Sequence, residues 1–295
     1  MSKNKKIIVT GGAGFVGTNL INFLLKKTKF KIISIDNYSS GKRINEIKNS
    51  RVRYIKGNTS EIKKLIKDPH KINSIFHFGE FARIYQSFFK MNECIDSNSL
   101  GSNAVFNFCF KNKIKLIYSA TSASLGNKGE DKNLSPYAFT KAKNLELLEN
   151  LKKWFNFKYE VIYFYNVYGP YQICEGEMST VIGIFEDHFN RGKPLPVVKP
   201  GTQTRRFTHI DDTIKICYLA WRKNMCRHYS IANKKSYSII EVAKLFKTKI
   251  KYLPKRPGER YSSAISRKNL SNKIFRYYGK FSLKKYINSV IKNKN

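Results

Sequence analysis

The sequence predicts an α/β protein with a doubly wound parallel sheet, followed by a smaller α/β lobe. Two observations support this class. Short β-rich runs alternate with helical patterns through the first half of the chain, as they do in parallel sheets with crossover helices. Beyond Asn166 this alternation loosens, and Gly and Pro cluster at residues 169–170, 192–201 and 254–258, which indicates a loop-rich second lobe.

Each predicted strand is a short run rich in β-branched or aromatic residues, and each predicted helix is a longer mixed pattern between two such runs. In order along the chain, strands are expected at residues 6–10 (KIIVT), 31–36 (KIISID), 52–56 (VRYIK), 74–78 (SIFHF), 115–119 (KLIYS) and 160–165 (EVIYFY). Helices are expected between them at residues 14–27, 60–67, 97–111 and 138–155. We therefore assign residues 1–165 to a first domain and 166–295 mainly to a second lobe, with segments near 203–232 expected to return to the first.

Composition excludes several classes of protein. With 41% hydrophobic and 14% aromatic residues in 295, the chain can bury a sizeable core and is not a disordered tail. It holds no apolar run long enough to span a bilayer, and its first apolar stretch is too short for a signal peptide. The five cysteines are odd in number and show no CxxC spacing. We therefore expect a reduced, cytoplasmic protein with neither a membrane partner nor a bound metal.

The net charge of +36 comes from 56 Lys and Arg residues against 20 Asp and Glu residues. Nucleic-acid binding is one explanation. Compositional bias is the other, because the excess is mostly Lys and is spread along the whole chain, whereas nucleic-acid grooves combine clustered basic residues with aromatic ones. We favour bias and expect no nucleic-acid partner, although the field would assist a small anionic substrate.

A glycine-rich turn follows the first predicted strand. The run IIVTGGAGFVG places Gly11, Gly14 and Gly17 between that strand and an amphipathic helix. Glycines permit the tight turn and the close approach of a pyrophosphate, and the helix N-terminus offers free N–H groups to the anion. Asp36 ends the next strand, where a carboxylate accepts from ribose hydroxyls and repels a 2′-phosphate. The first domain is therefore expected to be a Rossmann domain that binds NAD rather than NADP.

Two Tyr-x-x-x-Lys pairs occur, Tyr38/Lys42 and Tyr137/Lys141. This spacing puts both side chains on one face of a helix, but Tyr and Lys are so frequent here that chance alone explains such pairs. Position decides between them. Tyr137/Lys141 follows the strand at 115–119, at the carboxyl edge of the sheet where ligands bind, whereas Tyr38/Lys42 lies on the adenosine side.

Eight segments occur in one order: GGAGFVG, IDNYSSGKR, FHFGEFA, YSATSASLG, SPYAFTK, YNVYGP, TRRFTHIDD and KRPGE. Together they resemble the extended short-chain dehydrogenase/reductase family, in particular its NAD-dependent nucleotide-sugar epimerase/dehydratase group. UDP-glucose 4-epimerases are the most similar type. The resemblance covers nearly the whole chain.

The resemblance implies roles for individual residues. The implied catalytic residues are Thr121, Tyr137 and Lys141. The implied cofactor-binding residues are Gly11, Gly14, Phe15, Val16, Gly17, Asp36, Asn37, Asn58, Thr59, Phe78, Gly79, Asn98, Tyr137 and Lys141, with Asn58 standing where the family usually has Asp. The implied substrate-binding residues are Thr121, Asn166, Arg205, Arg256, Glu259 and Ser263. A free Tyr titrates near pH 10, and a neighbouring ammonium favours the phenolate that a general base requires.

The residues after Thr121 bear on the reaction. Sugar dehydratases of the family carry an Asp-Glu pair directly after the catalytic Thr, and decarboxylases carry a Glu two residues after it. Here Ser122 and Ala123 follow, so neither carboxylate is present. The sequence therefore favours a nucleotide-sugar 4-epimerase acting through a transient 4-keto sugar. A 4-keto reductase or an oxidase is the alternative, a 4,6-dehydratase is less favoured, and a non-enzymatic nucleic-acid-binding protein is disfavoured by the catalytic set.

Some positions depart from the family's pattern. Ten residues separate Gly126 from Tyr137, about half of what the resemblance leads us to expect. Glu80 replaces a small residue near the cofactor, and His77 is interpreted as a packed strand residue.

The resemblance also bears on substrate and assembly. A small Ser263, four places after Glu259, predicts that UDP-N-acetylhexosamines are accepted as well as UDP-hexoses. A homodimer is expected through the predicted helices at 97–111 and 138–155, and a role in polysaccharide biosynthesis is expected by analogy.

Overall fold

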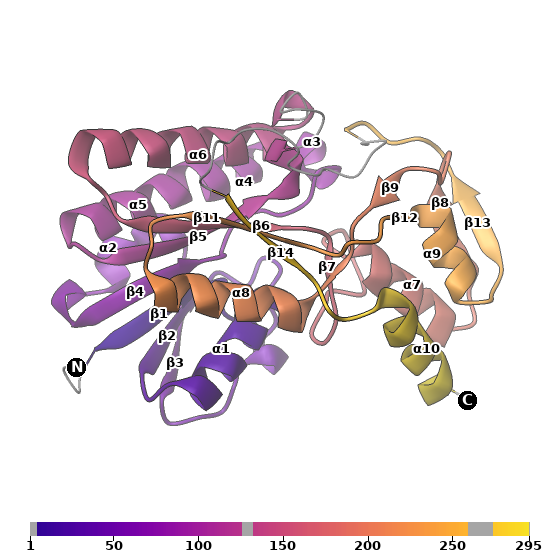
Figure 1. Cartoon of the computed structure of the whole chain (residues 1–295), viewed down its shortest axis with the longest axis horizontal. Helices are drawn as coiled ribbons and strands as arrows, with labels where there is room; N and C mark the ends of the chain where they lie inside the picture. The colour runs from indigo at the N-terminus through magenta and orange to yellow at the C-terminus, as the bar shows by residue number, and fades with distance from the viewer. Residues whose placement is uncertain (1–4, 126–131, 259–273, 295) are drawn as a thin grey trace.

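An eight-stranded sheet forms the centre of the computed structural model, which describes residues 5–125, 132–258 and 274–294 (Figure 1). All neighbouring strands in this sheet are parallel. In spatial order they are β14 (Ile274–Tyr278), β11 (His228–Ala232), β6 (Tyr159–Phe164), β5 (Lys115–Thr121), β4 (Ile72–His77), β1 (Lys6–Thr10), β2 (Lys31–Asp36) and β3 (Val52–Lys56). The predicted fold class is confirmed.

The strand order fixes where a ligand can bind. From β1 the chain adds β2 and β3 toward one edge, then returns to β4 and adds β5 and β6 toward the other. The order therefore reverses between β1 and β4. In open α/β sheets this reversal leaves a crevice at the carboxyl ends of the strands.

Helices cover both faces of the sheet (Figure 1). One face carries α1 (Phe15–Lys27) and α8 (Ile210–Lys223), and the other carries α2 (Ile62–Leu65), α5 (Ser102–Lys111) and α6 (Pro136–Phe155). Side chains alternate along each strand, so β1 sends Ile8 into one apolar layer and Ile7 and Val9 into the other. Burial on both faces explains why these strands read as continuous apolar runs.

Observed and predicted elements agree best at the start of the chain. The first three strands have the predicted bounds, and β4 and β5 differ from prediction by two residues at most at either end. The predicted helix at 97–111 is instead a continuous path through α4 (Met91–Ile95), a π-helical turn (Asp96–Gly101) and α5. At the end of this turn a Cβ on Gly101 would lie 2.3 Å from Thr59 Oγ1, so the wider turn passes close to the loop after β3.

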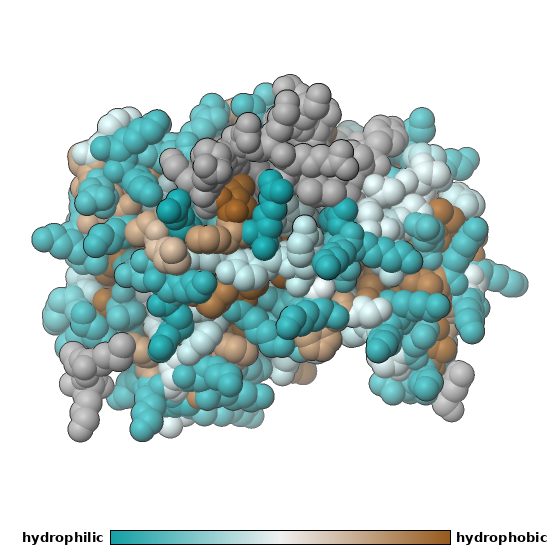
Figure 2. All heavy atoms as spheres, in the orientation of Figure 1, coloured by the Kyte–Doolittle hydropathy of each residue, from teal (hydrophilic) through white to brown (hydrophobic). Residues whose placement is uncertain are grey.

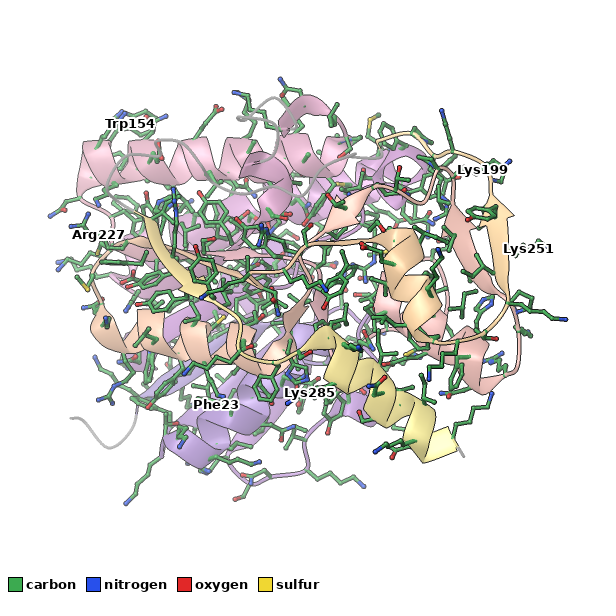
Figure 3. The ribbon with its side chains drawn as sticks, turned by 45° about the vertical axis from the view of Figure 1, so that its right-hand side comes forward. Phe23, Trp154, Lys199, Arg227, Lys251 and Lys285 are labelled. Atoms are coloured by element: carbon green, nitrogen blue, oxygen red, sulfur yellow. The ribbon has the colours of Figure 1, made fainter. Side chains whose placement is uncertain are left out.

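A second lobe stands beside the carboxyl edge of the sheet (Figure 1). It contains α7 (Val181–Asn190), α9 (Ile239–Leu245), α10 (Leu283–Lys294), the parallel pair β8 (Leu195–Val198) and β13 (Ile250–Leu253), and the short pairs β7 (Val167–Tyr168) with β10 (Thr208–His209) and β9 (Thr204–Arg205) with β12 (Tyr237–Ser238). Its own apolar core includes Phe185 and Phe246. Lys199 and Lys251 extend outward from its outer edge (Figure 3).

Three later elements leave this lobe and join the sheet. Helix α8 packs against it, and strands β11 and β14 extend it beyond β6. From the sequence, segments near residues 203–232 were expected to return to the first domain. The position of β14 as the edge strand was not predicted.

Hydrophilic side chains cover most of the face shown in Figure 2. In the described ranges, no helix combines the length and apolar character needed to cross a bilayer. All five cysteines are free, and no group of His, Cys, Asp or Glu within the described segments is arranged to hold a metal ion.

Candidate active site

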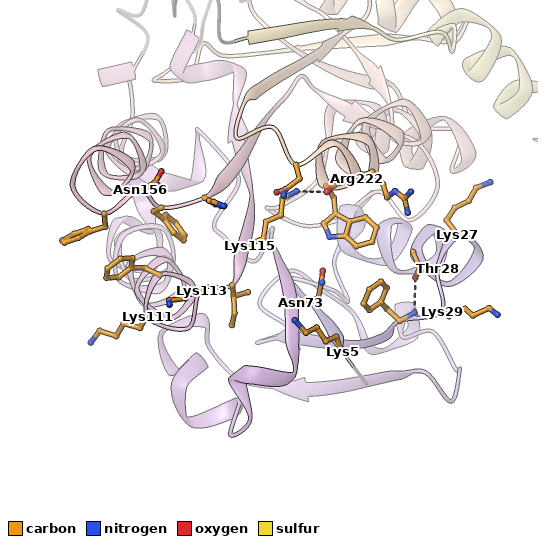
Figure 4. Close-up of a pocket in the computed structure, with 18 residues that line it drawn as sticks. Lys5, Lys27, Thr28, Lys29, Asn73, Lys111, Lys113, Lys115, Asn156 and Arg222 are labelled. Atoms are coloured by element: carbon orange, nitrogen blue, oxygen red, sulfur yellow. Dashed lines mark hydrogen bonds between the residues drawn. The ribbon is translucent and has the colours of Figure 1, made fainter. Parts of the chain in front are cut away.

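Two cavities stand out in the described part of the chain. The larger, about 1370 Å³, lies at the amino ends of the strands and is lined by lysines such as Lys5, Lys111 and Lys113 together with aromatic rings (Figure 4). The smaller, about 670 Å³, lies at the carboxyl ends and contains the glycine-rich turn, Tyr137 and Lys141. Because ligands of open α/β sheets bind at the carboxyl ends, the smaller cavity is the candidate active site despite its size.

The glycine-rich turn is built for close approach. Gly11 has a φ of +70°, and a Cβ there would lie 2.9 Å from the Cα of Gly79, which follows β4. A Cβ on Gly17 would lie 2.0 Å from the carbonyl oxygen of Gly11. Because Gly11 and Gly17 carry no side chain, the backbone segments pack closely there. The N-terminus of α1 therefore lies at the cavity, and its first turn holds no acidic residue. Free N–H groups at a helix N-terminus fit a diphosphate, so this turn fits a dinucleotide.

Asp36 lines the cavity at the end of β2. It is buried, and its two oxygens accept from the backbone N–H groups of Ala13 at 2.9 Å and Tyr38 at 2.8 Å. Burial raises the pKa of this carboxyl, and these hydrogen bonds oppose the shift. Beside it, Asn37 Nδ2 donates to Asn58 Oδ1 at 2.9 Å. Asp36 therefore anchors the glycine-rich turn, and its carboxylate fits the predicted contact with a ribose.

This geometry leads to a prediction about cofactor choice. Asp36→Asn keeps the size and one acceptor oxygen but removes the charge that repels a 2′-phosphate, so we expect the preference for NAD over NADP to shrink at least about tenfold. Binding titrations with both cofactors measure it. Equal preference ratios in the two proteins would contradict the prediction. Asp36→Ala is a poorer variant because it releases both the Ala13 and the Tyr38 amides, whereas Asn releases one of them.

Helix α6 presents Tyr137 and Lys141 from its first two turns. Ser135 caps the helix by accepting from the N–H of Ala138 at 3.1 Å, and Tyr137 donates its own N–H to Ser87 Oγ at 3.2 Å. Both Tyr137 and Lys141 line the cavity. Lys141 is 3% exposed. Its Nζ donates to the carbonyl oxygen of Ser119 at 2.5 Å, and its position 4.7 Å from the centroid of the Tyr118 ring adds a cation–π contact.

The Lys141 ammonium also forms an ion pair with Glu80, a contact that sequence reasoning did not find. The Glu80 side chain is only 2% exposed. Its other oxygen accepts from Ser102 Oγ at 2.7 Å, the Tyr118 hydroxyl at 3.1 Å and Asn144 Nδ2 at 3.2 Å. A buried carboxylate requires such partners, so Glu80 stands at the centre of a polar network behind Lys141.

His77 continues the network away from the cavity. It is fully buried at the end of β4, with Nδ1 2.8 Å from Thr10 Oγ1 and Nε2 2.9 Å from Ser102 Oγ. Burial lowers the pKa of His77 from 6.5 to about 4, although attraction to Glu80 opposes part of this shift. The imidazole is therefore neutral near neutral pH.

The buried neutral imidazole predicts acid sensitivity. In the unfolded chain His77 binds a proton below its ordinary pKa of 6.5, whereas in the folded chain it does so only below about pH 4. Because the unfolded chain binds more protons between these two pH values, the free energy of unfolding falls as the pH is lowered from about 6.5 to about 4. The expected loss at about pH 5 is about 2 kcal/mol. The free energy of unfolding can be measured with denaturant near neutral pH and at about pH 5. The decrease between the two pH values should be smaller in His77→Gln than in the unmodified protein by that amount. Equal losses in both proteins would show that His77 does not cause the effect.

Arg83 is a second feature that sequence reasoning missed. This half-buried residue lines the cavity, with Nε donating to the Met178 carbonyl oxygen at 2.8 Å and Nη1 donating to that of Ala82 at 2.7 Å. Burial lowers the pKa of Arg83 to about 10, and attraction to Tyr137 opposes the shift. The Arg83 guanidinium and Tyr137 therefore share the cavity, close enough for their charges to interact. In the sequence, only the position of Arg83 directly after the segment FHFGEFA indicated that it could line the cavity.

Not every predicted residue lines the cavity. Those that do are Gly11, Gly14, Phe15, Val16, Gly17, Asp36, Asn37, Asn58, Thr59, Phe78, Gly79, Tyr137 and Lys141. Asn98 lies outside the lining and is fully buried, with Oδ1 accepting from Phe81 N at 2.7 Å and Nδ2 donating to Phe81 O at 3.0 Å. Through these two hydrogen bonds Asn98 holds the segment after β4 at Phe81, which lines the cavity. Thr121 is buried at the end of β5, and its Oγ1 accepts from Ala123 N at 3.2 Å.

The predicted substrate residues that the structure describes, Thr121, Asn166, Arg205 and Arg256, do not line this cavity. Asn166 follows β6 and donates through Nδ2 to the Arg206 carbonyl oxygen at 3.2 Å. Arg205 is buried in β9, and the guanidinium of Arg256 lies 4.8 Å from the centroid of the Tyr85 ring. A Cβ on Gly258 would lie 2.8 Å from the Phe88 ring, so this segment packs on the short helix α3 (Gln86–Phe89). Glu259 and Ser263 lie outside the described residues.

Comparisons with known proteins agree with this geometry. The model of the NAD dependent epimerase/dehydratase family matches residues 7–232. A dTDP-D-glucose 4,6-dehydratase of Dictyostelium discoideum is 28% identical over 268 residues, which are 81% of this chain. The match spans only 61% of that longer protein.

Solved structures extend the likeness. A UDP-glucuronic acid 4-epimerase variant from Bacillus cereus, in complex with NAD and a fluorinated UDP-sugar, is 26% identical with a TM-score of 0.84, covering 98% of this chain and 100% of that one. A UDP-glucose 4-epimerase from Thermotoga maritima, solved with UDP-glucose, shares the fold at 24% identity with a TM-score of 0.82, covering 97% of each chain. Since the glycine-rich turn and Asp36 fit the dinucleotide, the cofactor is NAD. This chain belongs to the NAD dependent epimerase/dehydratase family.

Proposed function

We propose that the protein is a nucleotide-sugar 4-epimerase that inverts C4 of a UDP-linked hexose through a transient 4-keto sugar. The observation that carries the proposal is the set of ionisable side chains at the sugar end of the cavity. Tyr137 and Lys141 are there, and the buried carboxylate beside them, Glu80, is ion-paired with Lys141.

The chain's own residues suit the first and last proton transfers. The Tyr137 oxygen removes the proton from the sugar C4 hydroxyl and returns it after the sugar has turned. The positive charges of Lys141 and Arg83 favour the phenolate that this step needs. Thr121 holds the sugar oxygen at the end of β5. NAD, when bound, supplies a hydride acceptor that gives the hydride back to C4.

Elimination of water would need a further acid and base near C5 and C6. The positions where family dehydratases carry carboxylates hold Ser122 and Ala123, which are 4% and 1% exposed. Neither side chain can exchange a proton as a carboxyl does. This supports epimerisation over 4,6-dehydration, although a dehydratase is among the relatives.

The substrate side of the proposal rests on the two arginines. Forked guanidinium groups bind diphosphate better than ammonium groups, and we propose that Arg205 and Arg256 grip the UDP diphosphate, with Asn166 beside it. Glu259 would contact the nucleoside ribose. A small residue at Ser263 would leave room for an N-acetyl group on C2.

Product analysis tests the proposal. NMR of UDP-glucose, UDP-galactose and their N-acetylated counterparts, each incubated with enzyme and no added cofactor, should show interconversion at C4 for both kinds of sugar. A 4-keto-6-deoxy sugar or a pentose as the main product would overturn the reaction. Turnover that requires stoichiometric NAD or NADH would instead indicate an oxidase or a reductase. Conversion of plain hexoses alone would refute the N-acetyl proposal.

We also propose a homodimer, because α4, the π-helical turn after it and α6 carry exposed apolar side chains. Met91 is 50% exposed, Leu100 58% and Phe139 48%. Helices α4, α5 and α6 run together along one face (Figure 1). We expect Leu100→Arg with Phe139→Arg to convert the dimer to a folded monomer in sedimentation velocity. The control, Ile44→Arg, replaces an apolar residue that is 88% exposed elsewhere and should leave the dimer intact. A monomeric unmodified protein would refute the proposal.

A further inference from the structure

The Glu80 carboxylate is the least expected group in the active site. Its neighbour Gly79 makes the close contact between the ends of β1 and β4. Glu80, the next residue along the chain, also lines the cavity, and its charged side chain is buried. The side chain is 2% exposed and ion-paired with Lys141. Three further donors reach its other oxygen, namely Ser102, Tyr118 and Asn144.

These contacts define what Glu80 can do. One oxygen faces the ammonium and the other accepts the three neutral donors, so both are occupied by protein groups. A buried carboxylate with every oxygen engaged is a poor general base for a substrate. It can, however, hold a cation in one place, because Lys141 Nζ is shared between this carboxylate and the Ser119 carbonyl oxygen.

We propose that Glu80 is a positioning residue of the active site, which fixes the Lys141 ammonium against the Ser119 carbonyl and offsets part of its positive charge at Tyr137. The inference rests on the proposed role of Tyr137 as the proton-transfer group. Glu80 acts through Lys141 and does not touch the sugar. It sets how strongly Lys141 favours the Tyr137 phenolate, and therefore the pH range in which the enzyme works.

Two sets of titratable groups surround Lys141 and Tyr137. The buried or half-buried groups from β4 and its following loop, from β5 and from α4 are His77, Tyr118, Cys94, Glu80 and Arg83. Lys90, Glu93 and Asp96 line the same cavity from α4 and its two ends. Burial keeps His77, Cys94 and Tyr118 neutral near neutral pH, because it lowers the pKa of His77 to about 4, raises that of Cys94 to about 11 and raises that of Tyr118 well above its usual value of 10. Glu80 is therefore the one buried negative charge in the first set, whereas Glu93 and Asp96 are exposed to solvent, which screens their charges.

The test is the pH profile of Glu80→Gln. Glutamine keeps the size and an acceptor oxygen but removes the charge, while the Ser119 carbonyl and the Tyr118 ring still favour the ammonium. The rate of NAD reduction in a single turnover with a nucleotide sugar should then have its acid limb about one pH unit lower. An acid limb that is unchanged or moves to higher pH would overturn the inference.

Glu160 supplies a matched control. It is also a fully buried carboxylate, with its Oε1 3.6 Å from Lys115 Nζ and two backbone N–H partners, but it lies at the amino end of β6. Glu160→Gln should lower the thermal midpoint and leave the acid limb in place. If it moves the acid limb as Glu80→Gln does, the shift is a general effect of destabilisation and the inference fails.

The readout also separates this inference from the proposed reaction. Reduction of NAD by the sugar begins the epimerase, dehydratase and oxidase reactions alike, so the acid limb can be measured whichever product forms. A wrong product would refute 4-epimerisation while leaving the Glu80 test intact. A 4-epimerase whose acid limb ignores Glu80 would refute only the positioning role.

Discussion

Tyr137→Phe is expected to lose about 10²- to 10⁴-fold in kcat, the usual contribution of a positioned acid–base group. The substitution removes only the ionisable oxygen. The backbone N–H of Tyr137 still donates to Ser87, and the Ser135 cap is untouched, so α6 should keep its place. Affinities for NAD and for the nucleotide sugar should therefore stay within a few-fold of the unmodified protein.

The matched control for this variant is Tyr38→Phe. Tyr38 belongs to the other Tyr-x-x-x-Lys pair, and its hydroxyl donates to Glu46 Oε1 at 2.6 Å beside the adenosine-side loop. Loss of this hydrogen bond should cost little stability and almost no turnover. Steady-state kinetics and cofactor titrations on both variants decide the assignment. Near-normal turnover by Tyr137→Phe would refute Tyr137 as the proton-transfer group.

Lys141→Met is expected to destabilise the folded protein by about 3–5 kcal/mol, beyond its effect on catalysis. Methionine fills much of the volume but leaves the Glu80 carboxylate buried without its cation. The loss should appear in the free energy of unfolding measured with urea. A loss of activity in Lys141→Met therefore does not by itself show a catalytic role, because the variant also loses folded protein.

The double variant Glu80→Gln/Lys141→Met separates the two effects. Removing both charges leaves no uncompensated buried ion, so most of the stability lost in Lys141→Met should return, while turnover should not. Additive losses of stability in the double variant would show that the two side chains do not form the buried pair described here.

The central sheet was largely predictable because its strands are buried on both faces. Runs such as KIIVT and KIISID are short, rich in Ile and bounded by turn residues, so β1 and β2 have the predicted bounds. The edge strand β14 was not predicted. Its sequence IFRYY includes exposed positions, and its partner β11 lies far away in the sequence. The π-helical turn within 96–101 was also missed, because apolar periodicity does not distinguish it from a continuing α-helix.

The candidate site was predictable where a local pattern carries the chemistry. The glycine-rich turn, Asp36 and the Tyr137/Lys141 pair each lie within a few residues of a strand end or a helix start, and they meet in one cavity. The pairing of Glu80 with Lys141 spans 61 residues and depends on how α6 packs beside β4 and β5. No local pattern encodes that contact, and only the unusual Glu after Gly79 hinted at it.

The most direct test of the account follows the hydrogen at C4. A UDP-hexose carrying deuterium at C4 should be converted by the purified protein, with no added cofactor, into a mixture in which both epimers keep the deuterium at C4. This is expected because hydride leaves C4 and returns to the same carbon after the 4-keto sugar turns. Deuterium found at C6 would show dehydration, and deuterium lost from the sugar to the cofactor would show net oxidation of C4. Either result would contradict 4-epimerisation.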